Sequence, residues 1–225
     1  MKRQTKILLL LAAALANHAF GQSTFRNLNF EETTLPYSTN PMGFVSAAEA
    51  FPAWTVYYGS APQTQVVYNG VTGPPAIVIW NRDFGSFPPL PASFGSFSPR
   101  LSPTTAVPLG VSLAQVGTIP DGVNSLSFET VQTFFNATFQ VSFGGNVLPL
   151  QSVSGPNPSR TSWFADLTGL SGRTDELRIS AIPFENHPGS AQLDNLQFIT
   201  VPEPRAWVLF LAGTAFLLAA RRRRL

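Results

Sequence analysis

The sequence predicts an all-β protein, an antiparallel β-sandwich of the jelly-roll kind, and three observations support this prediction. Short runs rich in β-branched and aromatic residues recur along the chain, about eleven of them, with turn residues in between. Glycine (17), proline (20) and phenylalanine (19) are abundant and only 12% of the residues are charged, a composition typical of β-structure. Between residues 22 and 200 no segment carries a convincing apolar stripe with the helical period.

The expected strands follow one another with turn signals between them. In chain order they span residues 25–30, 54–59, 64–70, 76–80, 110–117, 124–130, 137–145, 146–153, 162–167, 176–182 and 191–200. The clearest hairpin is 137–153, because Phe139, Val141 and Phe143 alternate with polar residues and the Gly-Gly-Asn step at 144–146 supplies the turn.

Two stretches depart from this pattern. Residues 41–51 are expected to form a helical turn or two. Residues 82–103 contain repeated prolines and two Gly-Ser-Phe steps. Because proline cannot pair within a central strand, a long surface loop is expected there. This loop is either a passive insertion or an aromatic flap beside a binding face.

The amino-terminal residues 1–21 have the features of a secretory signal peptide. Basic residues precede the apolar run 7–16, and small residues Ala19 and Gly21 stand at the positions that signal peptidase reads. We expect export and cleavage before Gln22. An uncleaved anchor helix is the alternative, but the apolar run is shorter than the roughly 17–25 residues that a membrane span needs.

The carboxyl terminus contains a second apolar segment. Residues 206–220 are apolar or small apart from one threonine, and four arginines follow at 221–224. At ~1.5 Å per residue a helix over this segment covers about 22 Å, less than the ~30 Å hydrocarbon core, so it is a marginal membrane span. The arginines predict a cytoplasmic tail, with the preceding domain outside. A wholly buried helix of a soluble domain is the alternative.

The order of features in residues 201–225 resembles a known sorting signal. Pro202, Glu203 and Pro204 precede the helix at 206–220 and the arginine cluster. This arrangement is similar to the PEP-CTERM signal of exopolysaccharide-producing Gram-negative bacteria. The resemblance implies that exosortase, a membrane protease, recognises the Pro-Glu-Pro motif after transient anchoring in the inner membrane. It also implies delivery to the cell surface or the extracellular matrix.

The two ends also explain the net charge of +2 and the pI of about 9.3. Without the signal peptide and the segment from 201 onward, six basic and eleven acidic residues remain, which gives residues 22–200 a net charge of −5. This region contains no lysine and no cysteine, and its length suits one domain. Nucleic acid is not expected as a partner, because binding to phosphates needs clustered cations.

A second resemblance covers most of residues 22–200. The stretches NLNFE, FPAWTVY and AQLDNLQFITVPEP are similar to segments of galactose-binding-like jelly rolls, a fold shared by many carbohydrate-binding modules. In that fold a structural Ca²⁺ often lies where the first and last strands meet. The resemblance implies that Glu31 and Asp194 would be its carboxylate ligands, with Asn29 and Asn195 as further oxygen donors. Ordinary capping and turn roles for these residues are the alternative.

The sequence offers little for catalysis. Residues 22–200 lack the cysteine and lysine of covalent catalysis, and their one histidine, His187, has no Gly-x-Ser-x-Gly serine to partner it. Paired carboxylates of a polysaccharide hydrolase remain an alternative, with four candidates. These are Asp83, Glu129, Asp166 and Asp194. We predict that the protein is not an enzyme.

Aromatic rings favour a binding role, because sugars stack on flat rings while amides and hydroxyls set their orientation. The candidate stacking residues are Trp54, Tyr57, Tyr58, Trp80 and Trp163, with Tyr68 also available. The sequence thus predicts an exported surface or matrix protein that binds polysaccharide. A purely structural or adhesive protein without glycan binding is the alternative.

Overall fold

The computed structural model describes residues 23–38, 43–70, 75–84, 94–134, 137–155, 160–184 and 187–200. The expected signal peptide (1–21), the Pro-Glu-Pro motif (202–204), the apolar helix (206–220) and the arginine tail (221–224) lie outside these residues. Within the described ranges, no helix has the length and apolar character to cross a membrane.

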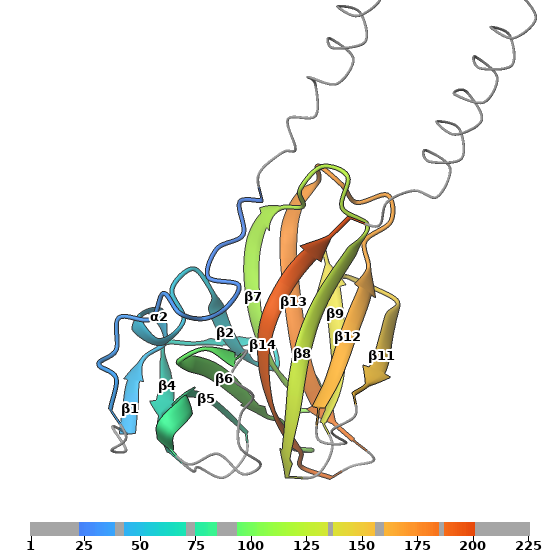
Figure 1. Ribbon diagram of the computed structural model, residues 1–225. Helices are drawn as coiled ribbons and strands as arrows, with labels where there is room; N and C mark the ends of the chain where they lie inside the picture. The colour runs from blue at the N-terminus through green and yellow to red at the C-terminus, as the bar shows by residue number, and fades with distance from the viewer. Residues whose placement is uncertain are drawn as a thin grey trace, which may run out of the picture.

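Two β-sheets make up the fold (Figure 1). The eight-stranded sheet has the order β1 (Gly43–Ser46), β4 (Gln65–Tyr68), β5 (Ala76–Asn81), β6 (Phe97–Ser102), β14 (Ser190–Ile199), β8 (Ser125–Phe134), β12 (Arg160–Asp166) and β11 (Leu150–Ser154). The six-stranded sheet has the order β10 (Asn146–Val147), β9 (Ala137–Phe143), β13 (Thr174–Pro183), β7 (Val111–Thr118), β2 (Thr55–Tyr58) and β3 (Ala61–Gln63). Strands β4 and β5 pair in parallel and the other neighbours are antiparallel. The prediction of a largely antiparallel β-sandwich is confirmed.

The core lies between the two sheets and follows the alternation of the strands. In β8, Leu126 and Phe128 are fully buried, and Trp163 of β12 stacks on Phe128 with ring centroids 6.1 Å apart. From the opposite sheet, Phe139 of β9 packs against both rings. Each buried side chain of this size stabilises the fold by roughly 1.5–3 kcal/mol. The alternate residues along β8 and β12 point away from the core. The outer face of the eight-stranded sheet at these strands is therefore available for function.

Strand β5 is buried on both faces. Ile77 and Ile79 belong to the main core, whereas Val78 and Trp80 form a second apolar cluster with Val67 of β4. The continuous apolar run Ala-Ile-Val-Ile-Trp reflects this double burial.

Strand β6 corrects the prediction of a long loop over residues 82–103. This strand contains Pro99, is fully buried and lies between β5 and β14. Pro99 is opposite Ile79, whose carbonyl accepts a hydrogen bond from the Asn69 N–H, so the backbone polar groups of Ile79 face β4. Pro99 has no N–H to donate, but at this position β5 turns no carbonyl towards β6 that would need one. On its other side, β6 pairs with β14 only at Arg100 and Leu101.

The expected hairpin forms, but its return strand is short. Gly144 and Gly145 have φ of 56° and 76°, as a two-residue turn with the twist of the strands requires. Asn146 and Val147 pair back onto β9, and β11 then crosses to the other sheet. The expected helical turn is also present, as α2 (Ala47–Ala50).

The amino-terminal segment is not the strand expected at 25–30. Asn27 and Phe30 adopt left-handed backbone conformations, with φ of 51° and 57°, which break an extended strand. The segment docks instead as a turn against β14. The N–H of Leu196 donates to the carbonyl of Leu28, at 3.2 Å, and Phe30 is fully buried.

Candidate functional site

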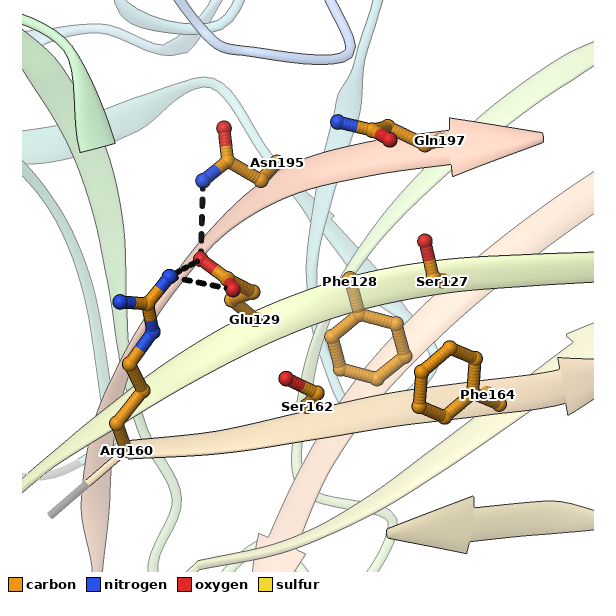
Figure 2. A pocket seen from close by; sticks show the side chains of 8 residues that line it. All are labelled: Ser127, Phe128, Glu129, Arg160, Ser162, Phe164, Asn195 and Gln197. Carbon is orange, nitrogen blue, oxygen red and sulfur yellow. Dashed lines mark hydrogen bonds and ion pairs between the residues drawn. The ribbon is translucent and has the colours of Figure 1, made fainter. Parts of the chain in front are cut away.

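A groove lies on the face of the eight-stranded sheet that points away from the core (Figure 2). Its volume is about 350 Å³, and strands β8, β12 and β14 supply its lining. The lining residues are Ser127, Phe128, Glu129, Arg160, Ser162, Phe164, Asn195 and Gln197. Apart from the buried Phe128, the five lining residues of β8 and β12 are placed on this face by strand alternation, and most of the lining residues carry hydroxyls, amides or charged groups.

Three polar side chains form a network at one end of the groove. Arg160 Nη2 lies 2.5 Å from Glu129 Oε1 and 2.6 Å from Oε2, and Asn195 Nδ2 donates to Oε2 at 3.1 Å. The side chains of Arg160 and Glu129 are 35% and 21% exposed, so the ion pair is partly shielded from water. The register explains the contact, because Glu129 is opposite Ser162 and Arg160 is its diagonal neighbour on the same face.

Asn195 reaches the groove because β14 is irregular at this point. The pairing of β14 with β8 shifts between Asp194 and Gln197, and Asn195 has φ of 57°. The bulge places the side chains of Asn195 and Gln197 in the groove while Leu196 remains buried in the core. Bulges often re-aim side chains in this way near functional sites.

A second hollow of about 250 Å³ lies on the same face of the sheet, towards β11. Its lining residues are Asn124, Ser125, Pro149, Gln151, Phe164, Asp166 and Thr168. Hydrogen bonds from the side chain and the backbone N–H of Thr168 lower the pKa of Asp166, which is therefore ionised at neutral pH. The half-buried Phe164 belongs to both hollows.

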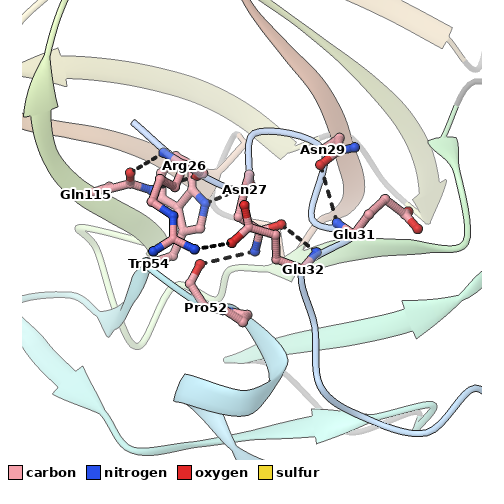
Figure 3. Close-up of polar contacts among 8 residues, drawn as sticks. All are labelled: Arg26, Asn27, Asn29, Glu31, Glu32, Pro52, Trp54 and Gln115. Atoms are coloured by element: carbon pink, nitrogen blue, oxygen red, sulfur yellow. Dashed lines mark hydrogen bonds and ion pairs between the residues drawn. The ribbon is translucent and has the colours of Figure 1, made fainter. Parts of the chain in front are cut away.

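The structure corrects most of the expected stacking residues. Trp54 and Trp80 are 5% and 4% exposed, so their rings are core residues that cannot receive a sugar. Trp54 donates its indole N–H to the carbonyl of Asn27 (Figure 3), and Trp80 packs under the guanidinium of Arg100 at 5.0 Å. Tyr68 is also fully buried.

The remaining aromatic candidates are partly exposed but engaged elsewhere. Trp163 packs in the core, and its indole N–H donates to Thr130 Oγ1 at 2.9 Å. Tyr58 packs against the core, and its hydroxyl accepts the N–H of Ile77. Tyr57 lies on the six-stranded sheet with the guanidinium of Arg178 over its ring at 4.0 Å. None of the five expected rings lines either hollow.

The expected cation ligands Glu31 and Asp194 are brought into electrostatic range of each other. Glu31 Oε1 accepts the N–H groups of Ser96 and Phe97 at 2.8 and 2.9 Å. Asp194 is 1% exposed, and among the described residues its Oδ2 has no hydrogen-bond partner. Burial raises the pKa of Asp194 to about 9, and the negative charges of Glu31 and Glu129 add to this, against the hydrogen bond from the N–H of Asn195.

The two expected amide ligands behave differently. Asn29 Oδ1 accepts the N–H of Glu31 at 3.5 Å, so Asn29 lies next to Glu31 (Figure 3). Asn195 Nδ2 donates to Glu129 in the groove, and the assignment of Asn195 as a cation ligand stays a prediction. In the part of the chain that the structure describes, no group of three or more His, Cys, Asp or Glu side chains could hold a metal ion by themselves. A cation here would therefore need amide or carbonyl oxygens besides Glu31 and Asp194.

Of the four carboxylates considered for a hydrolase, Glu129 of β8 and Asp194 of β14 are opposite each other in the sheet, whereas Asp166 and Asp83 lie elsewhere. Glu129 lines the groove and Asp166 the second hollow, whereas Asp194 is buried immediately before the bulge of β14. Asp83 accepts a hydrogen bond from the hydroxyl of Tyr37 at 2.7 Å, in the short helix η1 (Arg82–Phe84).

The fold and the groove together define a class: a two-sheet β-sandwich with an open polar groove on one sheet. No family model matches the chain, and no curated protein matches it. Among solved structures, it is similar to a glycoside hydrolase family 43 arabinoxylan arabinofuranohydrolase from Bacillus subtilis, in complex with cellotetraose. The TM-score is 0.36 and the identity 12%, and the match covers 56% of this chain and 25% of that one.

This comparison contradicts the prediction that the protein is not an enzyme, because the similar structure is that of a hydrolase. An enzymatic class is therefore no longer excluded. At this TM-score the likeness transfers neither an activity nor catalytic residues to the chain.

Sequence reasoning did not identify the groove. Arg160, Phe164 and Gln197 were not among the expected site residues, and Glu129 was considered only as a hydrolase carboxylate. One usable signal was the polar alternation in residues 124–130, which marks one face of the strand as exposed. The meeting of Glu129 with Arg160, 31 residues away, depends on strand pairing.

Proposed function

We propose that the protein binds polysaccharide in the groove of the eight-stranded sheet. The observation that carries this proposal is the Glu129–Arg160–Asn195 network on an open sheet face, beside the ring of Phe164. A sugar presents hydroxyl groups around an apolar ring face. Charged and amide groups in fixed orientations bind the hydroxyls, while an aromatic side chain covers the apolar face.

The network gives the groove a fixed arrangement of donors and acceptors before a ligand arrives. Charge-assisted hydrogen bonds hold the Glu129 carboxylate from two sides, so its remaining lone pairs have set directions. Ser127, Ser162 and Gln197 add groups that both donate and accept. Because these side chains stand on paired strands, ligand binding costs little backbone entropy.

The sorting signal of the sequence is consistent with such a ligand. The resemblance of residues 201–225 to a PEP-CTERM signal supports delivery to the surface or exopolysaccharide matrix of a Gram-negative bacterium, after signal peptidase and exosortase have acted. Mass spectrometry of the mature protein from its host tests this part. We expect a chain that begins at Gln22 and lacks residues 221–224, and a surface form that retains these arginines would contradict the sorting proposal.

We also propose a structural Ca²⁺ between Glu31 and Asp194, as the jelly-roll resemblance implies. The buried, unpartnered Oδ2 of Asp194 supports this, because a buried carboxylate oxygen needs a cation or a proton. Glu31 is anchored by backbone N–H groups through Oε1, and Asn29 lies next to it. Such an ion would fasten the amino-terminal turn to the last strand of a jelly roll.

Affinity electrophoresis of the purified protein in gels containing polysaccharides tests the binding proposal. We expect retardation by at least one polysaccharide and its loss in Gln197→Ala. The matched control is Gln140→Ala, which removes the same side chain from β9 on the opposite sheet. Equal retardation of both variants would place binding outside the groove. If no polysaccharide retards the wild-type protein, the proposed function is wrong.

A further inference from the structure

The two hollows share Phe164 and lie next to each other along β12. Arg160, Ser162, Phe164 and Asp166 are alternate residues of this strand and point to the same face. Arg160 and Asp166 are six residue-to-residue steps apart along the extended strand, which is about 20 Å at ~3.3 Å per step. This is a much longer surface than a single sugar ring requires.

We infer that the groove binds an internal stretch of a neutral polysaccharide chain that runs along β12, with Phe164 between two sugar subsites. This inference rests on the proposed function and specifies its ligand. The first subsite is the end with Glu129 and Arg160, and the second is the hollow with Gln151 and Asp166.

The cross-strand register supports this arrangement. Phe164 is opposite Gln151 of β11 on one side and Ser127 of β8 on the other, and Ser127 is in turn opposite Gln197 of β14. An aromatic ring therefore stands in a row of amide and hydroxyl groups that crosses four strands. A chain lying along β12 would cross this row at the ring, where an apolar sugar face can stack.

Each subsite has its own polar groups, so both can orient a sugar. The first contains the Glu129–Arg160–Asn195 network. The second contains Gln151, Thr168 and the Asp166 carboxylate, whose Oδ1 accepts the Thr168 N–H at 2.9 Å. A ligand that occupied only one subsite would leave the polar groups of the other to water.

The charge of the surface favours a neutral chain. In the first subsite Arg160 and Glu129 compensate each other at 2.5 Å, and the second contributes the negative charge of Asp166. Residues 22–200 carry a net charge of −5, which repels anionic polymers at low ionic strength. A uronic-acid polysaccharide would therefore meet an unfavourable potential along this surface.

Isothermal titration with xylo- and cello-oligosaccharides from dimer to hexamer tests the inference, with xylan and hydroxyethylcellulose as neutral polymers and alginate as the anionic one. We expect the affinity to rise at least tenfold from dimer to hexamer. Gln151→Ala should weaken hexamer binding at least fivefold and dimer binding by a smaller factor. Gln140→Ala on the other sheet should change neither.

The ring is tested separately. Phe164→Ala should abolish binding of the long chains, whereas Phe164→Tyr should retain it, and the melting temperature of both variants shows whether they fold. If the dimer binds as tightly as the hexamer and Gln151→Ala has no effect, the extended-chain inference is overturned while the proposed function stands. Tighter binding of alginate than of the neutral polymers overturns the neutral-ligand part. If none of these carbohydrates or polymers binds, the proposed function itself fails.

Discussion

Asp194 and Asn195 are consecutive residues of β14 whose side chains have different environments. The N–H of Asn195 donates to Asp194 Oδ1 at 2.7 Å, while the Asn195 side chain turns to Glu129 in the groove. Asp194 itself stays buried with Oδ2 unpartnered among the described residues. The bulge at Asn195 thus joins the proposed cation site to the proposed binding groove.

Replacing the Asp194 carboxyl with an amide should have opposite effects on stability with and without Ca²⁺. In chelator at pH 8, Asp194→Asn should be more stable than the wild-type protein, because it removes a buried carboxyl whose ionisation is costly. In Ca²⁺ the wild-type protein should be the more stable, because it alone keeps this ligand. Thermal unfolding of both proteins in both buffers measures this, and a difference that is independent of Ca²⁺ would contradict the cation site.

The stability of the chelator-treated protein should fall as pH rises. The folded-state pKa of Asp194 is raised from 3.8 to about 9, so between these values the folded protein retains a proton that the unfolded chain releases. The free energy of unfolding should then decrease by about 1.4 kcal/mol per pH unit in this window and level off above it. The difference between wild type and Asp194→Asn in urea titrations isolates this contribution. A flat difference from pH 5 to about 8 would contradict it.

Gly95→Ala should destabilise the protein by disrupting the hydrogen bonds of the Glu31 carboxylate. Gly95 has φ of +61°, and a Cβ there would lie 2.3 Å from Glu31 Oε1, displacing the carboxylate from the two N–H groups that it accepts. We expect a loss of about 3 kcal/mol from backbone strain and lost hydrogen bonds. Gly122→Ala is the control, because its φ is +74° but nothing lies within 4 Å of its Cβ. Equal losses in urea unfolding would show that strain alone acts at Gly95.

Arg160→Ala should affect both stability and binding. It leaves the Glu129 carboxylate, whose side chain is 21% exposed, without its cation, which should cost about 1–2 kcal/mol after allowance for solvent screening. Arg26→Ala is the control, because its ion pair with Glu32 is 69% and 41% exposed and should be worth less than about 1 kcal/mol. Polysaccharide retardation should decrease only in Arg160→Ala. Unchanged retardation would exclude Arg160 from the binding groove.

Much of the fold was predictable because alternation is a local property. The expected segments at 124–130, 162–167 and 176–182 correspond to β8, β12 and β13, whose core-facing positions are mostly apolar. Strand β6 was missed because its Pro99 argues against a central strand, and only the hydrogen bond from the Asn69 N–H to the Ile79 carbonyl shows why proline is tolerated there. Local pattern could not reveal this, because the orientation of a backbone donor depends on the neighbouring strands.

The candidate site, like the fold, was predictable from the sequence only in part. Glu31 and Asp194 were predicted as a pair because each lies in a stretch similar to a segment of galactose-binding-like jelly rolls. In the structure the negative charge of Glu31 acts on the Asp194 carboxyl. The aromatic residues were assigned wrongly because a tryptophan in a strand looks the same whether it faces the core or solvent. Trp54 and Trp163 face the core, whereas Phe164, next to Trp163 and so on the opposite face, lines the groove.

The sequence by itself therefore determined the β-rich character of residues 22–200 and their acidic charge, and it predicts the export and sorting signals. These are properties of composition and of short contiguous patterns. Only the tertiary structure decided which face of β12 is open, that Glu129 meets Arg160, and that Asn195 belongs to the groove. Those contacts join residues on different strands, and register and a single bulge determine them.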